Sequence, residues 1–274
     1  MKLPFKSAPK KTRVLLVPNH WSGSVQEYYH FILGYLGPIL VWQKSHPSKE
    51  IAIRDCGPMQ PWIDLLLDPD MVQQQNPGAM LHLVAQGQHP TVFLKGFDNP
   101  DYFDRKKLTE FRDIVLNRFS DLGETPSDTT VIDRSVSGEF NHSAAAEIPA
   151  SGSAVRSTPN LAGAVSAFKS QNNFRLVDSS LLVPLEQLAI FANTRILIGQ
   201  HGAGLTNMLW MRPGGTVIEI LPPLEPWVSP IFERLATTLG HKHVAIPQLG
   251  NHSDVDVIAL TQAIRNAQGE HSLA

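Results

Sequence analysis

The residues from Ile198 to Asn207 are of the kinds that bind phosphate groups. They read Ile-Gly-Gln-His-Gly-Ala-Gly-Leu-Thr-Asn and overlap the largely apolar run 195–198, which is typical of a buried parallel strand. Gly202 and Gly204 let the backbone approach an anion closely, and a helix that starts here directs its unpaired N–H groups at the same point. His201 adds a hydrogen bond or a positive charge. The spacing therefore predicts an anion-binding corner between a strand and a helix.

The rest of this run belongs to the same predicted corner, because it forms or adjoins the first turn of a helix expected over 205–211. The next strand is expected over 216–220, and Glu219 near its end could accept hydrogen bonds from ribose hydroxyls. Both features are typical of nucleotide sites in doubly wound sheets. The further candidate contacts to a nucleotide sugar are Ala203, Leu205, Thr206 and Asn207.

The glycine spacing differs from the dinucleotide fingerprint G-x-G-x-x-G, because Asn207 stands in place of the third glycine. The longer pattern, 201–207 followed by Pro213-Gly214 and Glu219-Ile220-x-Pro222, is more specific. It resembles the signature of glycosyltransferase family 61, which includes protein N-acetylglucosaminyltransferases and plant xylosyl- and arabinosyltransferases. The alternative is a glycine-containing turn without a ligand, but the His, Gly, Thr and Asn together exceed what a turn requires.

The bulk properties restrict the class of protein. The chain has 274 residues, enough for one large or two small domains, and its 42% hydrophobic and 18% charged residues allow a normal core. A formal net charge of -2 argues against a nucleic-acid partner. The single cysteine, Cys56, excludes an intrachain disulfide and a cysteine-based zinc site. No apolar stretch reaches about 18 residues, so we expect no integral membrane segment.

The amino-terminal residues bear on localisation. Residues 1–13 are basic, but the apolar run that follows, 14–17, is too short for the core of a signal peptide. Eukaryotic members of the family that the chain resembles carry a secretory address. We therefore expect a cytoplasmic protein if the chain is of bacterial type, and the lumen of the endoplasmic reticulum or Golgi if it is a eukaryotic chain without its leader.

The predicted elements form two α/β lobes, 1–122 and 123–274, with a long loop or partly disordered insert over the Ser-, Ala- and Gly-rich residues 135–172. With the nucleotide corner in the second lobe, this describes a GT-B-type fold, in which two Rossmann-like lobes enclose the active site in the cleft between them. The resemblance implies the same fold, with the first lobe on the acceptor side. The expected strands are 14–17, 51–53, 91–94, 129–134, 174–178, 195–198, 216–220 and 243–246, and the expected helices are 28–42, 104–119, 184–192, 205–211, 229–239 and 255–267.

Transfer of a sugar from a nucleoside diphosphate requires stabilisation of the leaving diphosphate. Arg134 ends the strand predicted over 129–134, where doubly wound folds place ligand-binding residues, and the resemblance implies a diphosphate contact for it. Relatives usually have a second arginine and an asparagine shortly afterwards, whereas this chain continues Ser-Val-Ser-Gly-Glu-Phe-Asn. Arg156 and Arg175 are candidate replacements, but nothing in the sequence places them.

The transfer also requires a group that takes a proton from the acceptor hydroxyl. His30 is the leading candidate, because the family has a histidine in a similar segment and a neutral imidazole titrates near neutral pH. Relatives often have an acidic residue shortly after this histidine, but Gly34 and Tyr35 follow it here. Asp55 and Asp98, in strand-end or loop positions, are the reserve candidates.

A metal site is not expected. Asp68-Pro69-Asp70 matches the metal-binding D-x-D pattern of other transferases, but that pattern is common by chance and Pro69 suits a turn. We therefore expect a metal-independent enzyme without a cofactor, in which a helix dipole and Arg134 replace the ion. The resemblance implies inversion at the anomeric carbon, a nucleotide-sugar donor that carries UDP, and a glycan or glycoprotein acceptor. The alternative is a non-catalytic protein that binds a nucleotide sugar or a glycan.

Overall fold

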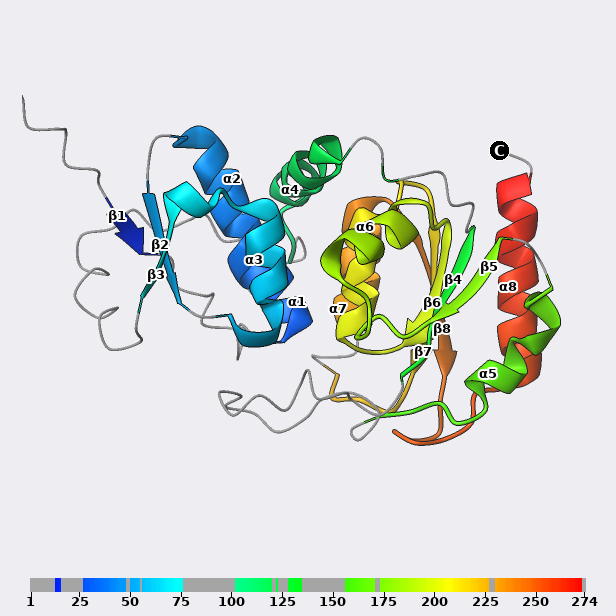
Figure 1. Ribbon diagram of the computed structural model, residues 1–274. Coiled ribbons are helices and arrows are strands. Elements are labelled where there is room, and N and C mark those ends of the chain that lie inside the picture. Colours follow the sequence, from blue (N-terminus) through cyan, green and yellow to red (C-terminus); the bar gives the residue numbers. More distant parts are fainter. Residues whose placement is uncertain are drawn as a thin grey trace, which may run out of the picture.

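The computed structural model describes residues 13–15, 27–47, 50–54, 56–75, 102–119, 122, 128–134, 156–170, 173–226 and 230–272 (Figure 1). Its larger sheet has five parallel strands in the order β5-β4-β6-β7-β8. The chain runs from the second strand position, β4, outward to β5, and then crosses back to β6, β7 and β8. The switch point of this doubly wound order lies between β4 and β6. The strands are β4 (Thr129–Ile132), β5 (Phe174–Val177), β6 (Ile196–Gln200), β7 (Thr216–Leu221) and β8 (Lys242–Pro247).

Helices cover both faces of this sheet, which explains why its central strands are largely apolar. On one face lie α6 (Pro184–Ala192), the 3-10 helix η8 (Ala203–Trp210) and α7 (Ile231–Leu239). The other face is covered by α5 (Leu161–Ala164), the 3-10 helix η7 (Ser166–Phe168) and α8 (Val257–Ser272), as Figure 1 shows.

The amino-terminal part contains a smaller parallel sheet, with strand order β1-β2-β3. The predicted helix 28–42 is present as three consecutive helical segments, the middle one of π type. The strand β3 was not predicted, because its sequence Val-Gln-Gln-Gln is polar. The elements are β1 (Arg13–Leu15), α1 (Tyr28–Phe31), η1 (Ile32–Leu36), α2 (Gly37–Ser45), β2 (Glu50–Arg54), η2 (Gly57–Met59), α3 (Gln60–Leu66), η3 (Pro69–Met71), β3 (Val72–Gln75) and α4 (Arg105–Arg118).

Trp210 of η8 joins the two parts. Its indole is fully buried, stacks on Trp62 of α3 with ring centroids 5.8 Å apart, and meets Phe111 of α4 edge-on at 5.4 Å. Its Nε1 donates a hydrogen bond of 3.3 Å to the hydroxyl of Tyr28. One hydrophobic core therefore runs from the amino-terminal helices to the helices that cover the larger sheet.

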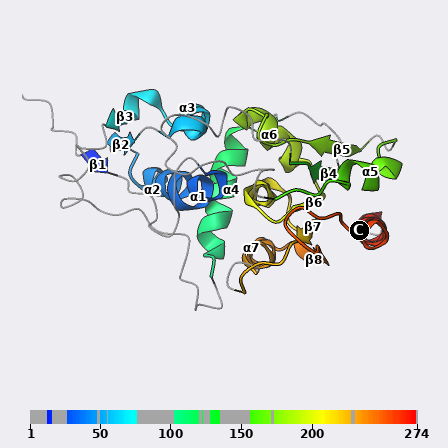
Figure 2. The ribbon, with the colours of Figure 1, turned by 90° about the horizontal axis from the view of Figure 1, so that it is seen from below.

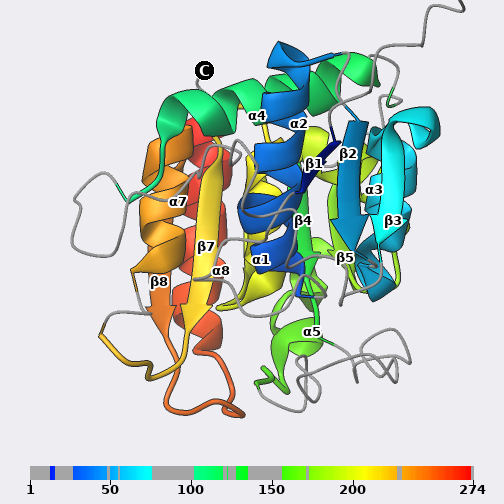
Figure 3. The ribbon, with the colours of Figure 1, turned by 90° about the vertical axis from the view of Figure 1, so that its left-hand side faces the viewer.

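The amino-terminal helices lie between the two sheets. Figure 2 shows α1, α2 and α4 between the small sheet and the elements of the larger one, and Figure 3 shows α1 and α2 in front of the larger sheet. The α/β class and the Rossmann-like order of the larger sheet are confirmed. The two-lobe GT-B arrangement and a boundary at residue 122 remain predictions.

The prediction of a loop or disordered insert through 135–172 is wrong for its second half. Residues 156–170 contain α5 and η7, and Leu161, Val165 and Phe168 are buried against the face that α8 covers. These residues are spaced by four and three positions, which is a helical period. The many Ala, Gly and Ser residues around these positions made the helical period hard to recognise in the sequence. Residues 135–155 and the predicted strand 91–94 lie outside the described residues.

Candidate functional site

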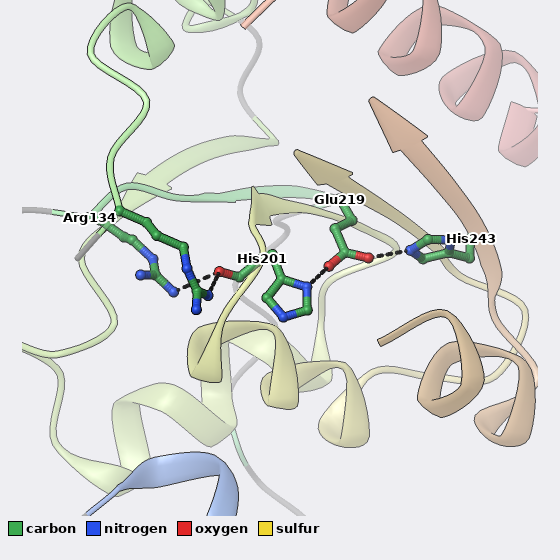
Figure 4. A network of polar contacts seen from close by, with 5 residues as sticks. Arg134, His201, Glu219 and His243 are labelled. Carbon is green, nitrogen blue, oxygen red and sulfur yellow. Dashed lines mark hydrogen bonds and ion pairs between the residues drawn. The ribbon is translucent and has the colours of Figure 1, made fainter. Parts of the chain in front are cut away.

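The candidate site lies at the carboxyl ends of β4 and β6, which are neighbours at the switch point of the sheet. In doubly wound sheets, ligands bind at this edge. Arg134 follows β4 and His201 follows β6, so parallel pairing brings the two residues together. Nη2 of Arg134 donates a hydrogen bond of 3.0 Å to the backbone carbonyl oxygen of His201 (Figure 4).

A second arginine reaches the same oxygen atom. Nη1 of Arg156 donates to the carbonyl of His201 at 3.0 Å, so two guanidinium groups converge on one acceptor. Burial, and then the positive charge of Arg156, lower the pKa of Arg134 to about 10, and burial lowers that of Arg156. No carboxylate of the described residues pairs with either group. Among the residues that the structure describes, these two arginines therefore have no carboxylate partner at this edge of the sheet.

Two buried glutamines fix the segment that carries Arg156. Nε2 of Gln200 and Nε2 of Gln248 each donate to the carbonyl of Ser157 at 3.1 Å, and Gln200 also donates to Oε1 of Gln248 at 2.6 Å. The N–H of Ser157 donates to the carbonyl of Asn251 at 2.8 Å. The residue next to Arg156 is thus tied to the ends of β6 and β8. We refer to Gln200, Gln248, Ser157 and Asn251 as the glutamine clamp.

Gly202 is required at its position for two reasons. Its φ of 155° lies in a region that other residues rarely adopt. In addition, a Cβ atom here would lie 1.4 Å from Nη2 of Arg134. Gly204 is also closely packed, because a Cβ would meet two methyl groups of Ile132 at 3.3 Å and Oγ of Ser179 at 3.4 Å.

The start of η8 offers backbone donors to the same corner. The N–H groups of Ala203 and Gly204 precede the first bond of the helix, which runs from the N–H of Leu205 to the carbonyl of Gly202 at 2.9 Å. Both residues are partly exposed. The helix is of 3-10 type from Ala203 onward, whereas the prediction was a helix over 205–211. Nδ2 of Asn207 donates to the carbonyl of Gly204 at 3.1 Å, which supports the tighter turn.

The side chains of Leu205, Thr206 and Asn207 are enclosed in the structure, although they were predicted to contact the nucleotide sugar. Oδ1 of Asn207 accepts a hydrogen bond of 2.7 Å from the hydroxyl of Tyr28. The 3-10 helix directs these side chains toward the interior, where they attach η8 to α1. Of residues 202–207, only Ala203 and Gly204 are partly exposed, so ligand contacts from the side chains of Leu205, Thr206 and Asn207 stay predictions.

Glu219 is fully buried and contacts the ring of His201, so it does not lie at the exposed carboxyl edge of the sheet. Its Oε1 is 2.5 Å from Nδ1 of His201, and its Oε2 is 2.7 Å from Nε2 of His243 (Figure 4). Burial alone would raise the pKa of Glu219, but hydrogen bonds and charge interactions with the two imidazoles outweigh it, so the pKa is lowered. Because Glu219 is fully buried, a contact with ribose would require its carboxylate to become accessible, and this contact stays a prediction.

His30 lies in the last turn of α1, partly buried. Its Nε2 is 3.3 Å from Oε2 of Glu27. The acidic neighbour of this histidine therefore lies three positions before it in the sequence, whereas relatives often have an acidic residue after it. Tyr29 packs edge-on against Phe232 at 5.8 Å, and the ring of His201 contacts the same phenylalanine at 4.9 Å. His30 is thus adjacent in sequence to a residue that shares a contact with His201. Asp55 and Asp98 lie outside the described residues.

The D-x-D segment forms a turn. Oδ1 of Asp68 accepts the N–H of Asp70 at 3.0 Å and Pro69 opens η3, so Asp68 caps this short helix. Among the residues that the structure describes, no group of three or more His, Cys, Asp or Glu side chains could hold a metal ion. No helix in the same residues is long and apolar enough to cross a membrane.

Two histidines whose pKa values are lowered by burial predict how the stability of the folded protein depends on pH. Burial lowers the pKa of His30 to about 4, and that of His241 also to about 4, the latter with opposition from a hydrogen bond to Met208. An unfolded histidine titrates near 6.5. As pH falls below about 6.5, the unfolded chain takes up protons that the folded one refuses, so the free energy of unfolding should decrease down to about pH 4.

Urea unfolding of the wild type and His241→Gln between pH 7 and pH 4 measures this effect. Glutamine can still donate to Met208 but does not titrate, so the decline should be shallower in the variant. Parallel curves for the two proteins would show that His241 is not held neutral by the fold.

The fold and the site together define a class of protein. A doubly wound parallel sheet with glycines, free backbone donors and arginines at its switch point is typical of nucleotide-binding α/β proteins. The family model described as Glycosyltransferase 61 matches residues 28–218, which is more than half of the chain. The chain belongs to this family and is a glycosyltransferase, so the resemblance given by the signature is confirmed. A search of individual curated proteins finds no match.

Proposed function

We propose that this glycosyltransferase takes its sugar from a nucleoside diphosphate, and that Arg134, Arg156 and the start of η8 bind the diphosphate. The observation that carries the proposal is the pair of guanidinium groups, each 3.0 Å from the carbonyl oxygen of His201 and without a carboxylate partner in the described residues. Guanidinium groups form paired hydrogen bonds with phosphate oxygens. A diphosphate therefore matches both the charge and the number of groups present.

The same cations would assist the chemistry. Negative charge develops on the diphosphate as its bond to the sugar breaks, and fixed positive groups at that point lower the barrier. The two arginines and the N–H groups of Ala203 and Gly204 supply the charge that a divalent cation supplies elsewhere, which supports a metal-independent reaction. Family membership supports UDP as the nucleotide, inversion at the anomeric carbon, and a glycan or protein hydroxyl as acceptor.

We propose His30 as the group that deprotonates the acceptor. With Glu27 beside Nε2, the atom left to accept a proton is Nδ1, and the carboxylate stabilises the imidazolium that forms. A pKa of about 4 keeps His30 neutral at neutral pH, but also makes it a weak base. Asp55, which follows β2 in the sequence, is the second candidate base.

Calorimetric titration with UDP, UMP, GDP and CDP, each with EDTA or with Mn²⁺, tests the diphosphate site. We expect UDP to bind without metal and more tightly than UMP. Arg134→Ala and Arg156→Ala should each weaken UDP binding about 10- to 100-fold, since a hydrogen bond to a charged group contributes about 1.5–3 kcal/mol.

Arg195→Ala is the matched control. This half-exposed arginine precedes β6 and therefore lies at the amino ends of the strands, away from the candidate site at their carboxyl ends. Its affinity for UDP should equal that of the wild type. Absence of nucleotide binding, or equal losses in all three variants, would refute the site. Hydrolysis of a UDP-sugar that is lost in His30→Ala would support transfer, whereas binding without turnover would support the non-catalytic alternative.

A further inference from the structure

A line of three side chains crosses the carboxyl half of the larger sheet. His201 follows β6, Glu219 is in β7 and His243 is in β8, so each comes from a neighbouring strand. Val217 pairs with His243 in the register of these strands, and Val217 packs into the core beneath η8 and α7. Because side chains alternate along a strand, Glu219 is on the same face as Val217. The line therefore runs along the face of the sheet that η8 and α7 cover.

The carboxylate in the middle decides how both imidazoles are oriented. Glu219 is fully buried, and an ionised carboxylate can only accept hydrogen bonds. The contacts of 2.5 Å and 2.7 Å therefore require an N–H on Nδ1 of His201 and on Nε2 of His243. The other nitrogen of a histidine is set by such a bond. The atom that His201 keeps for a ligand is Nε2, and it makes no hydrogen bond to any described residue.

We propose that His243 is a positioning residue of the donor site, which acts through Glu219 to fix the ring of His201 with Nε2 directed at the diphosphate. This inference rests on the proposed function for the identity of the ligand. The family match ends at residue 218, so His243 lies outside it.

The physical reason is that one imidazole cannot satisfy the carboxylate alone. Without His243, Oε2 of Glu219 would be a buried acceptor without a partner, which is costly, and the carboxylate would rotate or take up a proton. Either change removes the fixed acceptor of Nδ1 of His201. The backbone carbonyl of the same histidine holds Arg134 and Arg156, so the ring and the two guanidinium groups are anchored by a single residue.

Two substitutions at His243 distinguish the loss of its hydrogen bond to Glu219 from the loss of the imidazole ring itself. In His243→Gln, the amide nitrogen can reach Glu219 as Nε2 does, whereas the shorter side chain of His243→Asn cannot. His243 is mostly but not fully enclosed, with its side chain 10% exposed, so both polar variants are compatible with folding. Melting temperatures of both variants verify this directly.

The first readout is the imidazole proton of His201 in ¹H–¹⁵N spectra, assigned with His201→Asn. Wild type and His243→Gln should show a slowly exchanging proton on Nδ1, and His243→Asn should lose it. The second readout is calorimetric affinity for UDP, which should decrease about tenfold in His243→Asn and recover in His243→Gln, as is typical when the partner that orients a histidine is removed.

The outcomes are distinguishable from failure of the proposed function. If the Nδ1 proton persists in His243→Asn, or the loss is not restored by glutamine, His243 does not position His201. If the proton is lost but the affinity for UDP is unchanged, the line orients the ring without serving the donor site, and the proposal is overturned while the diphosphate site stands. If the wild type binds no nucleotide, the function fails, and the assignment to a donor site fails with it.

Discussion

Replacing Gly202 by alanine is expected to remove most of the binding of UDP while the protein stays folded. The new Cβ would lie 1.4 Å from Nη2 and 2.7 Å from Cζ of Arg134. The end of a flexible side chain can move more easily than the sheet, so Arg134 should swing away from the carbonyl of His201. The φ of 155° adds strain of about 1–3 kcal/mol. We expect the dissociation constant of UDP, measured by calorimetry, to rise about 10- to 100-fold.

Gly214 provides a control that separates backbone strain from displacement of Arg134. Its φ is 88°, but a Cβ there meets nothing within 4 Å. Gly214→Ala should therefore lower the melting temperature yet retain the affinity for UDP. Gly163 lies in α5 with no close neighbour and no positive φ, so Gly163→Ala should retain the affinity for UDP and raise the melting temperature slightly. Unchanged affinity in Gly202→Ala would show that the position of Arg134 does not matter for the ligand.

Truncation of Trp210 to alanine should give the largest loss of stability. The indole is fully buried between Trp62 and Phe111, and its removal also leaves the hydroxyl of Tyr28 without its donor. Loss of a buried aromatic side chain costs about 3–5 kcal/mol, through lost burial and the cavity left behind. Urea unfolding monitored by circular dichroism should show this decrease in a single transition, because the core is continuous between the two parts.

Ile258→Ala is the control for this measurement, because this side chain is 83% exposed, and its removal should change stability by less than about 0.5 kcal/mol. Two separate transitions in the wild type would contradict a continuous core and would support independently folding lobes. A loss in Trp210→Ala no larger than that of the control would mean that the stacked indoles contribute little.

The fold of the carboxyl-terminal part could be predicted from local patterns. Strands such as β6 and β7 are buried on both faces and therefore appear as largely apolar runs, and α6 begins with a proline at its first turn. β3 was not predicted because three of its four residues are glutamine, and α5 was not predicted because its small residues resemble those of a linker.

The candidate site was predictable only where it is local in sequence. The corner after β6 was found from its glycines, and Arg134 from the strand that it ends. The position of Arg156 depends on the glutamine clamp, whose bonds all join residues 43 or more positions apart, so no local spacing reveals it. The contact between Glu219 and His243 followed only from the register of β7 and β8, and the predicted contact of Glu219 with ribose stays a prediction.

The glutamine clamp fixes the segment that carries Arg156 through residues that follow this arginine in the sequence. Arg134 is placed by the strand it follows, but Arg156 is placed by bonds to the ends of β6 and β8. The cost of closing a connection rises only slowly with its length. Evolution can therefore lengthen or shorten the stretch between the two arginines while both guanidinium groups keep their bonds to the carbonyl of His201. In such proteins, an alignment that looks for the pair at a fixed separation would report a missing residue where the charge is in fact present.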